Sequence, residues 1–303
     1  MKSGMTYQGA VVPMVTPITS KGGLDEDALD RLIEVLLAGG VEGLFVLGTT
    51  GEGAHVPRPL RKRLVSRTVN RVNQRALVCA GMGDVQPGDI DLANDFLRAG
   101  ADAVVVHPPI SRPVPAAGLG RWYRGLLDQL NGPLILYNMP SITGVSIPLD
   151  AIESLIGHPN LAGIKDSEND TRRLEELLRR FGNRHGFSIF VGVGALMEKG
   201  LKLGAHGIVP SVGNLIPDVC QDLCVSAREG DWVRAAGHFS RMKAVAALYQ
   251  RGRTLNESLS VLKAAVHFRG LCQPYVLPPL STLSPAAMEK LRTQMSQLQL
   301  NGQ

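Results

Sequence analysis

The sequence predicts an α/β protein that folds as a closed (β/α)8 barrel, a TIM barrel, with a C-terminal helical extension. Three observations carry this prediction. Eight short runs rich in β-branched residues alternate with segments of helical periodicity, as a parallel barrel requires. The length of 303 residues suits one such barrel. The third observation is a repeated turn, in which glycine stands where a helix ends before the next strand, in Leu37-Ala-Gly-Gly, Leu97-Arg-Ala-Gly and Leu203-Gly-Ala.

The individual elements follow in order along the chain. The expected strands are Val11–Thr16, Gly43–Leu47, Leu77–Gly81, Ala103–His107, Leu134–Asn138, Leu161–Lys165, Ser188–Gly192 and Gly207–Pro210. Helical segments fill the intervals between strands, and the clearest of them are Asp25–Leu37, Pro57–Val72, Gly88–Leu97 and Asp170–Arg180.

After Pro210 the pattern changes, and only helices are expected. They are Pro217–Arg228, Trp232–Gln250, Glu257–His267 and Ser284–Leu298. The first belongs to the barrel, so we expect a barrel over residues 1–227 and a packed helical extension over residues 228–303. No low-complexity linker separates the two parts.

Composition narrows the class of protein. The net charge is +5, and the basic residues form no stripe interleaved with aromatics, so we expect no nucleic-acid partner. No apolar run approaches the roughly 20 residues of a membrane span, and no signal peptide is visible. The four cysteines lack the spacing of a metal site and indicate reduced structural thiols. We therefore expect a cytoplasmic protein with no metal, cofactor or membrane partner, and a charged fraction of only 19% favours a homo-oligomer.

The ends of the predicted strands carry the candidate chemistry, because barrel active sites lie at the C-terminal ends of their strands. Lys165 follows Leu161-Ala-Gly-Ile, so its stem leaves an apolar strand and its amine points into the barrel mouth. Desolvation at such a place disfavours the ammonium form and supplies a neutral amine that can attack a carbonyl. A strand-end lysine that extends to water is an equally good interpretation of this position alone.

Two neighbouring strand ends favour the catalytic interpretation. Tyr137 ends the fifth predicted strand, where a phenol could transfer protons, although a lone tyrosine would more often be a core residue. Gly48-Thr49-Thr50-Gly51 offers exposed N–H groups and two hydroxyls to a carboxylate, or is simply a tight turn.

Together these motifs resemble the dihydrodipicolinate synthase / N-acetylneuraminate lyase family of class I aldolases, over essentially the whole chain. The resemblance rests on Val-Thr-Pro, Gly-Thr-Thr-Gly-Glu, Tyr-Asn-x-Pro, Gly-x-Lys-Asp and Ser-Val-Gly-Asn, each at its expected strand end. It implies a Schiff base between Lys165 and pyruvate or a pyruvoyl-containing substrate, and Tyr137 as the proton-transfer phenol. It also implies a carboxylate site at Gly48, Thr49 and Thr50, a backbone carbonyl of Ile208 beside the lysine, and a homotetramer or dimer.

Three departures from the family pattern argue against the synthase activity. Ile110 stands where the synthase branch has a relay tyrosine, and Ile142 where it has a carboxylate-binding arginine. The loop Gly192–Ala195 lacks the acidic residues typical of the sialic-acid branch. The resemblance then points to a catabolic lyase.

The activity expected first is aldol cleavage of a 2-keto-3-deoxy sugar acid, or of a related hydroxy-oxo acid, to pyruvate and an aldehyde. Lys165, Tyr137 and Thr49 form the expected catalytic set, because Thr49 and Tyr137 supply a hydroxyl pair suited to deprotonating the C4 hydroxyl. Dehydration of a 2-keto-3-deoxy sugar acid through the same imine is the alternative, and a non-catalytic 2-oxo-acid sensor is a second one. Whether His107, Ser111 or Arg112 contacts substrate is left open.

Overall fold

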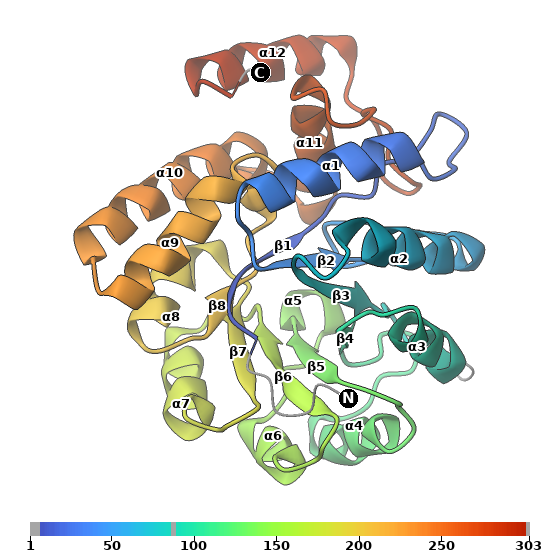
Figure 1. Cartoon of the computed structure of the whole chain (residues 1–303), viewed down its shortest axis with the longest axis vertical. Helices are drawn as coiled ribbons and strands as arrows, with labels where there is room; N and C mark the ends of the chain where they lie inside the picture. The colour runs from blue at the N-terminus through green and yellow to red at the C-terminus, as the bar shows by residue number, and fades with distance from the viewer. Residues whose placement is uncertain (1–6, 86–88, 301–303) are drawn as a thin grey trace.

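The computed structural model describes residues 7–85 and 89–300, and its strands form a closed barrel (Figure 1). All neighbouring strands are parallel, and β8 pairs with β1 to close the ring. The strands are β1 (Gly9–Pro13), β2 (Gly43–Val46), β3 (Leu77–Gly81), β4 (Ala103–Val106), β5 (Leu134–Asn138), β6 (Leu161–Asp166), β7 (Ser188–Val191) and β8 (Gly207–Ile208). The predicted fold class is confirmed.

Helices surround this ring and follow each strand in the chain. They are α1 (Glu26–Ala38), α2 (Arg58–Val72), α3 (Asp89–Arg98), α4 (Leu119–Leu127), α5 (Pro140–Thr143), α6 (Leu149–Leu155), α7 (Thr171–Phe181), α8 (Met197–Lys202) and α9 (Pro217–Glu229). A large hydrophobic core fills the layer between strands and helices, and a smaller one fills the barrel interior. The strands therefore bury both faces, which explains their near-continuous apolar sequences.

The helix boundaries agree with the predicted ranges to within one or two residues, and polar caps explain several starts. Asp25 accepts a hydrogen bond from the N–H of Ala28, and Asp170 accepts bonds from the first N–H groups of α7. Gly88, the predicted first residue of the third helix, lies outside the described residues, and the observed α3 begins at Asp89.

The first strand differs from its predicted range, because it begins at Gly9 and ends at Pro13 rather than running from Val11 to Thr16. The N–H of Val15 donates to the Asn214 side chain, 3.0 Å away, instead of to a neighbouring strand. A long-range side-chain partner thus ends the strand, and no local pattern announces it.

Four helices close the chain. After α9 come α10 (Trp232–Gln250), α11 (Leu255–Phe268) and α12 (Pro285–Gln297), the last at the top of Figure 1. The predicted boundary between residues 227 and 228 falls in the last turn of α9, and the division into two domains stays a prediction. Within the described ranges, no helix is long and apolar enough to cross a membrane.

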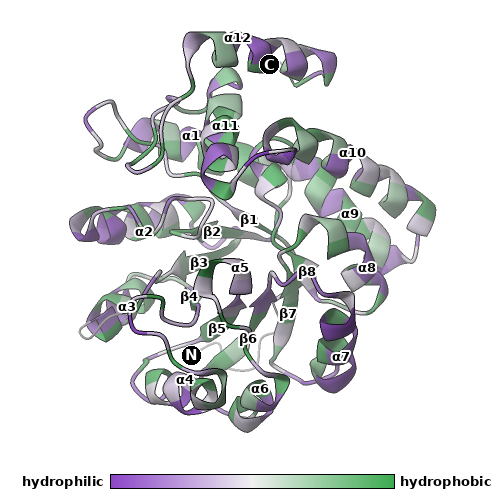
Figure 2. Cartoon of the chain, turned by 180° about the vertical axis from the view of Figure 1, so that it is seen from behind, coloured by the Kyte–Doolittle hydropathy of each residue, from purple (hydrophilic) through white to green (hydrophobic). Residues whose placement is uncertain are grey.

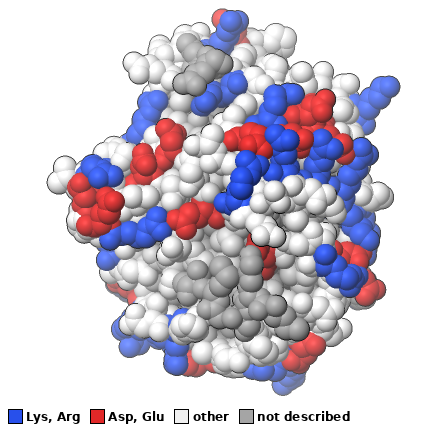
Figure 3. All heavy atoms as spheres, viewed as in Figure 1, with Lys and Arg blue, Asp and Glu red and all other residues white. Residues whose placement is uncertain are grey.

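Charged side chains of neighbouring helices form ion pairs on the surface. The outer faces of α2 and α7 carry hydrophilic residues (Figure 2). Figure 3 shows basic and acidic side chains interleaved on the face formed by α1 and α2. These are ion pairs such as Arg67 with Glu26 and Asp30, and Arg75 with Glu34. Three basic residues of α2, Arg63, Arg67 and Arg71, thus pair with acidic residues of α1, whereas Arg58 and Lys62 pair with Asp89 and Asp95 of α3.

Candidate active site

Lys165 lies on β6 and points into the barrel. Its side chain is buried, with 7% of the residue exposed, and its register partner on β5 is Tyr137. The Nζ atom lies 4.0 Å from the centroid of the Tyr137 ring and 4.9 Å from that of Phe45. Two aromatic faces against one nitrogen can stabilise positive charge there, including that of a protonated imine.

The amine of Lys165 is not committed to a structural partner. Across residues 7–85 and 89–300, no hydrogen bond or ion pair engages its Nζ. The adjacent Asp166 points the other way, toward the helix layer, where Arg173 Nε donates to it over 2.9 Å. Alternation along the strand thus separates the free amine from the nearest carboxylate in the sequence.

Gly192, just after β7, leaves room for the lysine. A Cβ atom at this position would lie 3.1 Å from Cε of Lys165 and 2.0 Å from Oγ of Ser167. A larger residue would therefore push on the lysine stem.

Tyr137 reaches the mouth of the barrel beside Thr49. The Tyr137 hydroxyl lies 3.4 Å from Oγ1 of Thr49, a weak hydrogen bond in which either atom could donate. The Tyr137 hydroxyl also contacts the sulfur of Met139. The phenol, the threonine hydroxyl and the lysine amine are therefore neighbours, although they come from β5, from the loop after β2 and from β6.

The loop after β2 has an unusual backbone. Leu47 has a positive φ of 57°, and its carbonyl is enclosed by Gly53 and Gly81. A Cβ atom on Gly53 would lie 1.8 Å from that carbonyl oxygen, and one on Gly81 would lie 2.3 Å from it. Only glycine fits at these two positions, so the turn is fixed by its neighbours.

The same loop presents donors in the direction of the mouth. The carbonyl of Gly48 accepts hydrogen bonds from the N–H groups of Gly51 and Gly53. In the described part of the chain, the N–H groups of Thr49 and Thr50 donate to no backbone carbonyl. Two adjacent free N–H groups and two hydroxyls form a suitable nest for a carboxylate.

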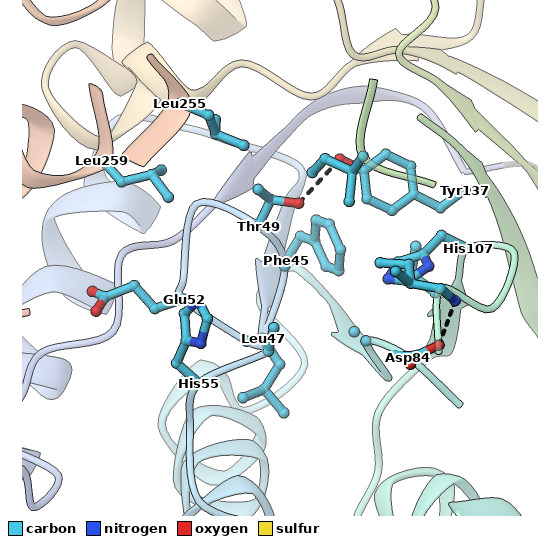
Figure 4. A pocket seen from close by; sticks show the side chains of 18 of the residues that line it. Phe45, Leu47, Thr49, Glu52, His55, Asp84, His107, Tyr137, Leu255 and Leu259 are labelled. Carbon is cyan, nitrogen blue, oxygen red and sulfur yellow. Dashed lines mark hydrogen bonds between the residues drawn. The ribbon is translucent and has the colours of Figure 1, made fainter. Parts of the chain in front are cut away.

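A cavity of about 320 Å³ opens beside Gly48, Thr49 and Tyr137 (Figure 4). Lys165 is not among its lining residues and faces a small cavity in the barrel interior, which Phe45 also lines. Thr49, Tyr137 and His107 line the larger cavity together with apolar residues, and Leu255, Asn256 and Leu259 of α11 form one wall. Ile110 and Ile142 also line it, so the two isoleucines seen in the sequence do face the candidate site.

His107 has a defined tautomer. Its Nδ1 lies 2.7 Å from the carbonyl oxygen of Pro108, which can only accept, so Nδ1 carries the proton. Burial lowers the pKa of this imidazole, and the neutral ring keeps Nε2 as a hydrogen-bond acceptor.

Asp84 holds the loop that follows β4. Its carboxylate accepts hydrogen bonds from the Ser111 hydroxyl and from the N–H groups of Ile110 and Ser111. Burial opposes the ionised carboxylate, but these bonds outweigh it and lower the pKa of Asp84. Ser111 is therefore committed to holding the loop.

The structure also places the remaining predicted residue. The Ile208 side chain belongs to the outer core, so only its backbone could face the barrel, while the adjacent Val209 lies in the interior. The role of the Ile208 carbonyl stays a prediction. No cluster of three or more His, Cys, Asp or Glu residues suited to a metal ion occurs among the described residues. Burial raises the pKa of the Cys79 thiol to about 12, and all four cysteines are buried and unpaired.

Sequence reasoning missed several residues that form the site. The ring of Phe45 lies against the Lys165 amine. In the sequence, Phe45 cannot be told apart from the other apolar residues of its strand. The wall from α11 lies more than 200 positions from Thr49, so no local motif connects the two. For Gly192 there was a signal, since glycine directly follows an apolar strand whose end faces the mouth.

The barrel and its buried strand-end lysine define a class of protein, the lysine-dependent class I lyases. The sequence profile of the dihydrodipicolinate synthetase family matches residues 6–298, and the chain belongs to that family. It is accordingly a lyase of the pyruvate-dependent aldolase family, whose members work through a lysine Schiff base.

Relatives in this family carry two kinds of name. The YagE protein of Escherichia coli K12, provisionally named a 2-dehydro-3-deoxy-D-gluconate aldolase, is 30% identical over 304 residues, or 99% of this chain and 100% of the relative. A 4-hydroxy-tetrahydrodipicolinate synthase of Anaeromyxobacter sp. is 32% identical over 295 residues, covering 97% and 98% of the two chains.

Solved structures are similar over almost the full length. Dihydrodipicolinate synthase from Bacteroides thetaiotaomicron superimposes with a TM-score of 0.91 at 31% identity, covering 98% of this chain and 100% of that one. YagE of E. coli K12, solved in complex with pyruvate, gives 0.90 at 29% identity, with the same coverage.

Proposed function

We propose that this chain cleaves a 2-keto-3-deoxy sugar acid, or a related hydroxy-oxo acid, to pyruvate and an aldehyde. The observation that carries the proposal is the cluster of the free Lys165 amine, the Tyr137 phenol and the Thr49 hydroxyl, with 3.4 Å between the two hydroxyl oxygens. The provisional name of YagE, which belongs to a full-length relative, supports the same class of substrate.

The reaction begins with an imine. The Lys165 amine attacks the C2 carbonyl to give a carbinolamine. Its hydroxyl takes the phenol proton of Tyr137 and leaves as water, so that a protonated imine and the Tyr137 phenolate remain. Thr49, Thr50 and their N–H groups hold the substrate carboxylate. This arrangement puts the electron-withdrawing imine nitrogen beside C3.

Cleavage then uses the hydroxyl pair. The C4 hydroxyl gives its proton to the phenolate of Tyr137, relayed by Thr49, and the C3–C4 bond electrons move into the imine. The aldehyde leaves, and an enamine remains on Lys165. The Tyr137 phenol gives the proton taken from the C4 hydroxyl to C3 of the enamine. One water molecule then hydrolyses the imine, which balances the water lost when it formed, and releases pyruvate, the Lys165 amine and the Tyr137 phenol.

The cavity suits an uncharged, hydroxylated tail. His107 offers a neutral Nε2 acceptor, and His55 and Asn256 also line the wall. A second carboxylate would instead face Ile142, which has no donor. This is the reason for preferring sugar acids to the synthase substrate.

A substrate panel tests the proposal. Purified protein is incubated with 2-keto-3-deoxy sugar acids and shorter hydroxy-oxo acids, and pyruvate and aldehyde are quantified together. We expect equimolar release of both products from at least one sugar acid. Loss of substrate without pyruvate, with a dehydrated oxo acid as product, would mean a dehydratase. No turnover together with a trapped imine would mean a sensor.

A further inference from the structure

A second buried lysine lies behind the carboxylate-binding loop. Lys263 comes from α11, and its Nζ lies 2.7 Å from Oε1 of Glu52, the residue that follows Thr49-Thr50-Gly51. The two side chains are only 1% and 2% exposed. The catalytic steps described above use neither group.

The other hydrogen bonds of this pair join two further chain segments to it. Lys263 Nζ also donates to the carbonyl of Thr16 over 2.6 Å and to that of Tyr275 over 3.1 Å. The second carboxylate oxygen of Glu52 accepts the N–H of Leu277 over 2.6 Å. The segment after β1, the loop after β2 and the segment after α11 therefore meet at one ion pair.

The loop is attached to this network at two adjacent residues. Glu52 has a positive φ of 56°, a conformation that a non-glycine residue adopts only where its surroundings impose it. The carbonyl of Gly51 accepts a hydrogen bond from the Thr16 hydroxyl over 2.6 Å. The conformation of residues 49–52 is thus held by polar contacts at Gly51 and Glu52.

A buried ion pair is a poor source of stability, because desolvation offsets its attraction. What such a pair does supply is a single geometry, since each charge is satisfied only in one arrangement. Its placement two residues from Thr50 puts that constraint where the substrate carboxylate would bind.

We propose that Glu52 and Lys263 are positioning residues through which the C-terminal extension sets the carboxylate-binding loop. The inference rests on the proposed function of that loop and of Lys165. It assigns the extension a part in binding, beyond the cavity wall made by Leu255 and Leu259.

The test compares two carbonyl compounds that differ in the carboxylate. Pyruvate and acetone are each trapped on the protein with borohydride, and the concentration that gives half-maximal adduct is measured by mass spectrometry. The Glu52→Gln/Lys263→Met double variant removes both charges, so no lone charge stays buried. We expect its half-maximal pyruvate concentration to rise by about 10-fold or more, equivalent to about 1.4 kcal/mol, with acetone trapping unchanged.

Two further variants keep the result decisive. Leu291→Ala in α12, where the side chain is 3% exposed, loosens the extension without touching the loop. This variant should lower Tm. The ratio of the half-maximal concentrations of pyruvate and acetone should stay as in the wild type. If the double variant does not fold, pyruvate and acetone trapping are compared in the Glu52→Gln single variant. Its amide oxygen still accepts the N–H of Leu277.

The outcomes separate this inference from the proposed function. A folded variant with wild-type pyruvate trapping, or with equal losses for pyruvate and acetone, would overturn the positioning role. Absence of any adduct in the wild-type protein would instead overturn the imine mechanism itself.

Discussion

Lys165 combines burial with a nitrogen that makes no hydrogen bond or ion pair within residues 7–85 and 89–300. Most buried lysines are paired, as Lys263 is, because an isolated buried charge is costly. Lys165 has only two aromatic faces beside it, so its nitrogen remains available for covalent bonding. This contrast between two buried lysines in one molecule is the physical argument for which of them reacts.

The first prediction concerns that bond. Incubation with pyruvate followed by borohydride should leave a reduced pyruvyl adduct on Lys165, because the amine is free and the carboxylate nest lies close by. Peptide mass spectrometry identifies the site, and Lys165→Ala, with Lys263 intact, serves as the control. Wild-type protein that stays unmodified at saturating pyruvate would refute the mechanism.

The second prediction concerns the phenol. Tyr137→Phe keeps the ring over Lys165 but removes the hydroxyl that faces Thr49, so turnover should fall by about 10²–10⁴-fold. Steady-state kinetics on the active substrate gives the value, and a melting curve checks that the fold is intact. A kcat near that of the wild type would mean that the phenol only packs.

At the scale of elements, β5 and β6 hold the two reactive side chains in register. Asn138 on β5 donates to Asp166 on β6 over 3.0 Å, and its amide oxygen accepts the N–H of Ile147. Burial raises the pKa of Asp166, and the Arg173 guanidinium opposes that shift. The outward residues of these strands thus form a polar clamp directly behind the inward pair, Tyr137 and Lys165.

The third prediction belongs to the end of β7. Gly192→Ala would place a methyl group 2.0 Å from Oγ of Ser167 and 3.1 Å from Cε of Lys165. The Ser167 hydroxyl must then move away, and the lysine must shift by a few tenths of an ångström. Because misplacement by about 1 Å can cost about 10²-fold, we expect turnover to fall by about 10-fold. The measurement is kcat/KM on the active substrate.

Gly194→Ala is the matched control, since nothing lies within 4 Å of a Cβ at that position. It should behave as the wild type. Equal activity in both variants would mean that the space beside Lys165 is not limiting.

At the scale of the whole molecule, the chain shares its fold with enzymes named as synthases. Two residues of its cavity, Ile110 and Ile142, lack the hydroxyl and the cation that the family resemblance leads us to expect in a synthase. Ile142 cannot pair with a second carboxylate, and Ile110 has no hydroxyl to relay a proton. Similarity of fold therefore does not decide the activity, because the activity depends on the residues that line the site.

The fourth prediction follows from this difference. A coupled assay with pyruvate and aspartate semialdehyde should show negligible condensation, because a buried carboxylate facing isoleucine loses a charge-assisted bond worth about 1.5–3 kcal/mol. Condensation at about 10⁴ M⁻¹s⁻¹ or better would mean that another cation serves the second carboxylate.

The homo-oligomer expected from the sequence also concerns the whole molecule, and it remains a prediction. Ile110 and Leu255 are 41% and 42% exposed and both line the cavity, so apolar surface surrounds its entrance. Burial of such surface against a second copy would stabilise an assembly.

Much of this protein could be predicted from local patterns. The barrel follows from eight apolar runs, and the ranges of β3, β5 and α10 match their predictions. Lys165, Tyr137 and Thr49 could be found because a barrel brings its strand ends to one face. What escaped local reasoning was contact between distant segments, such as Asn214 ending β1 and α11 forming a wall of the cavity.

The sequence by itself determined the class of fold, through its periodicity. It also indicated the candidate reactive residues and the two isoleucines that disfavour synthase activity, through strand-end motifs that resemble those of a known family. Only the tertiary structure decided which buried lysine is free, which tautomer His107 adopts and what holds the loop at Glu52. Those properties depend on partners up to 247 positions apart, as Lys263 is from Thr16. Hydrogen bonds and ion pairs act over a few ångströms, so their partners are known only once folding has brought them together.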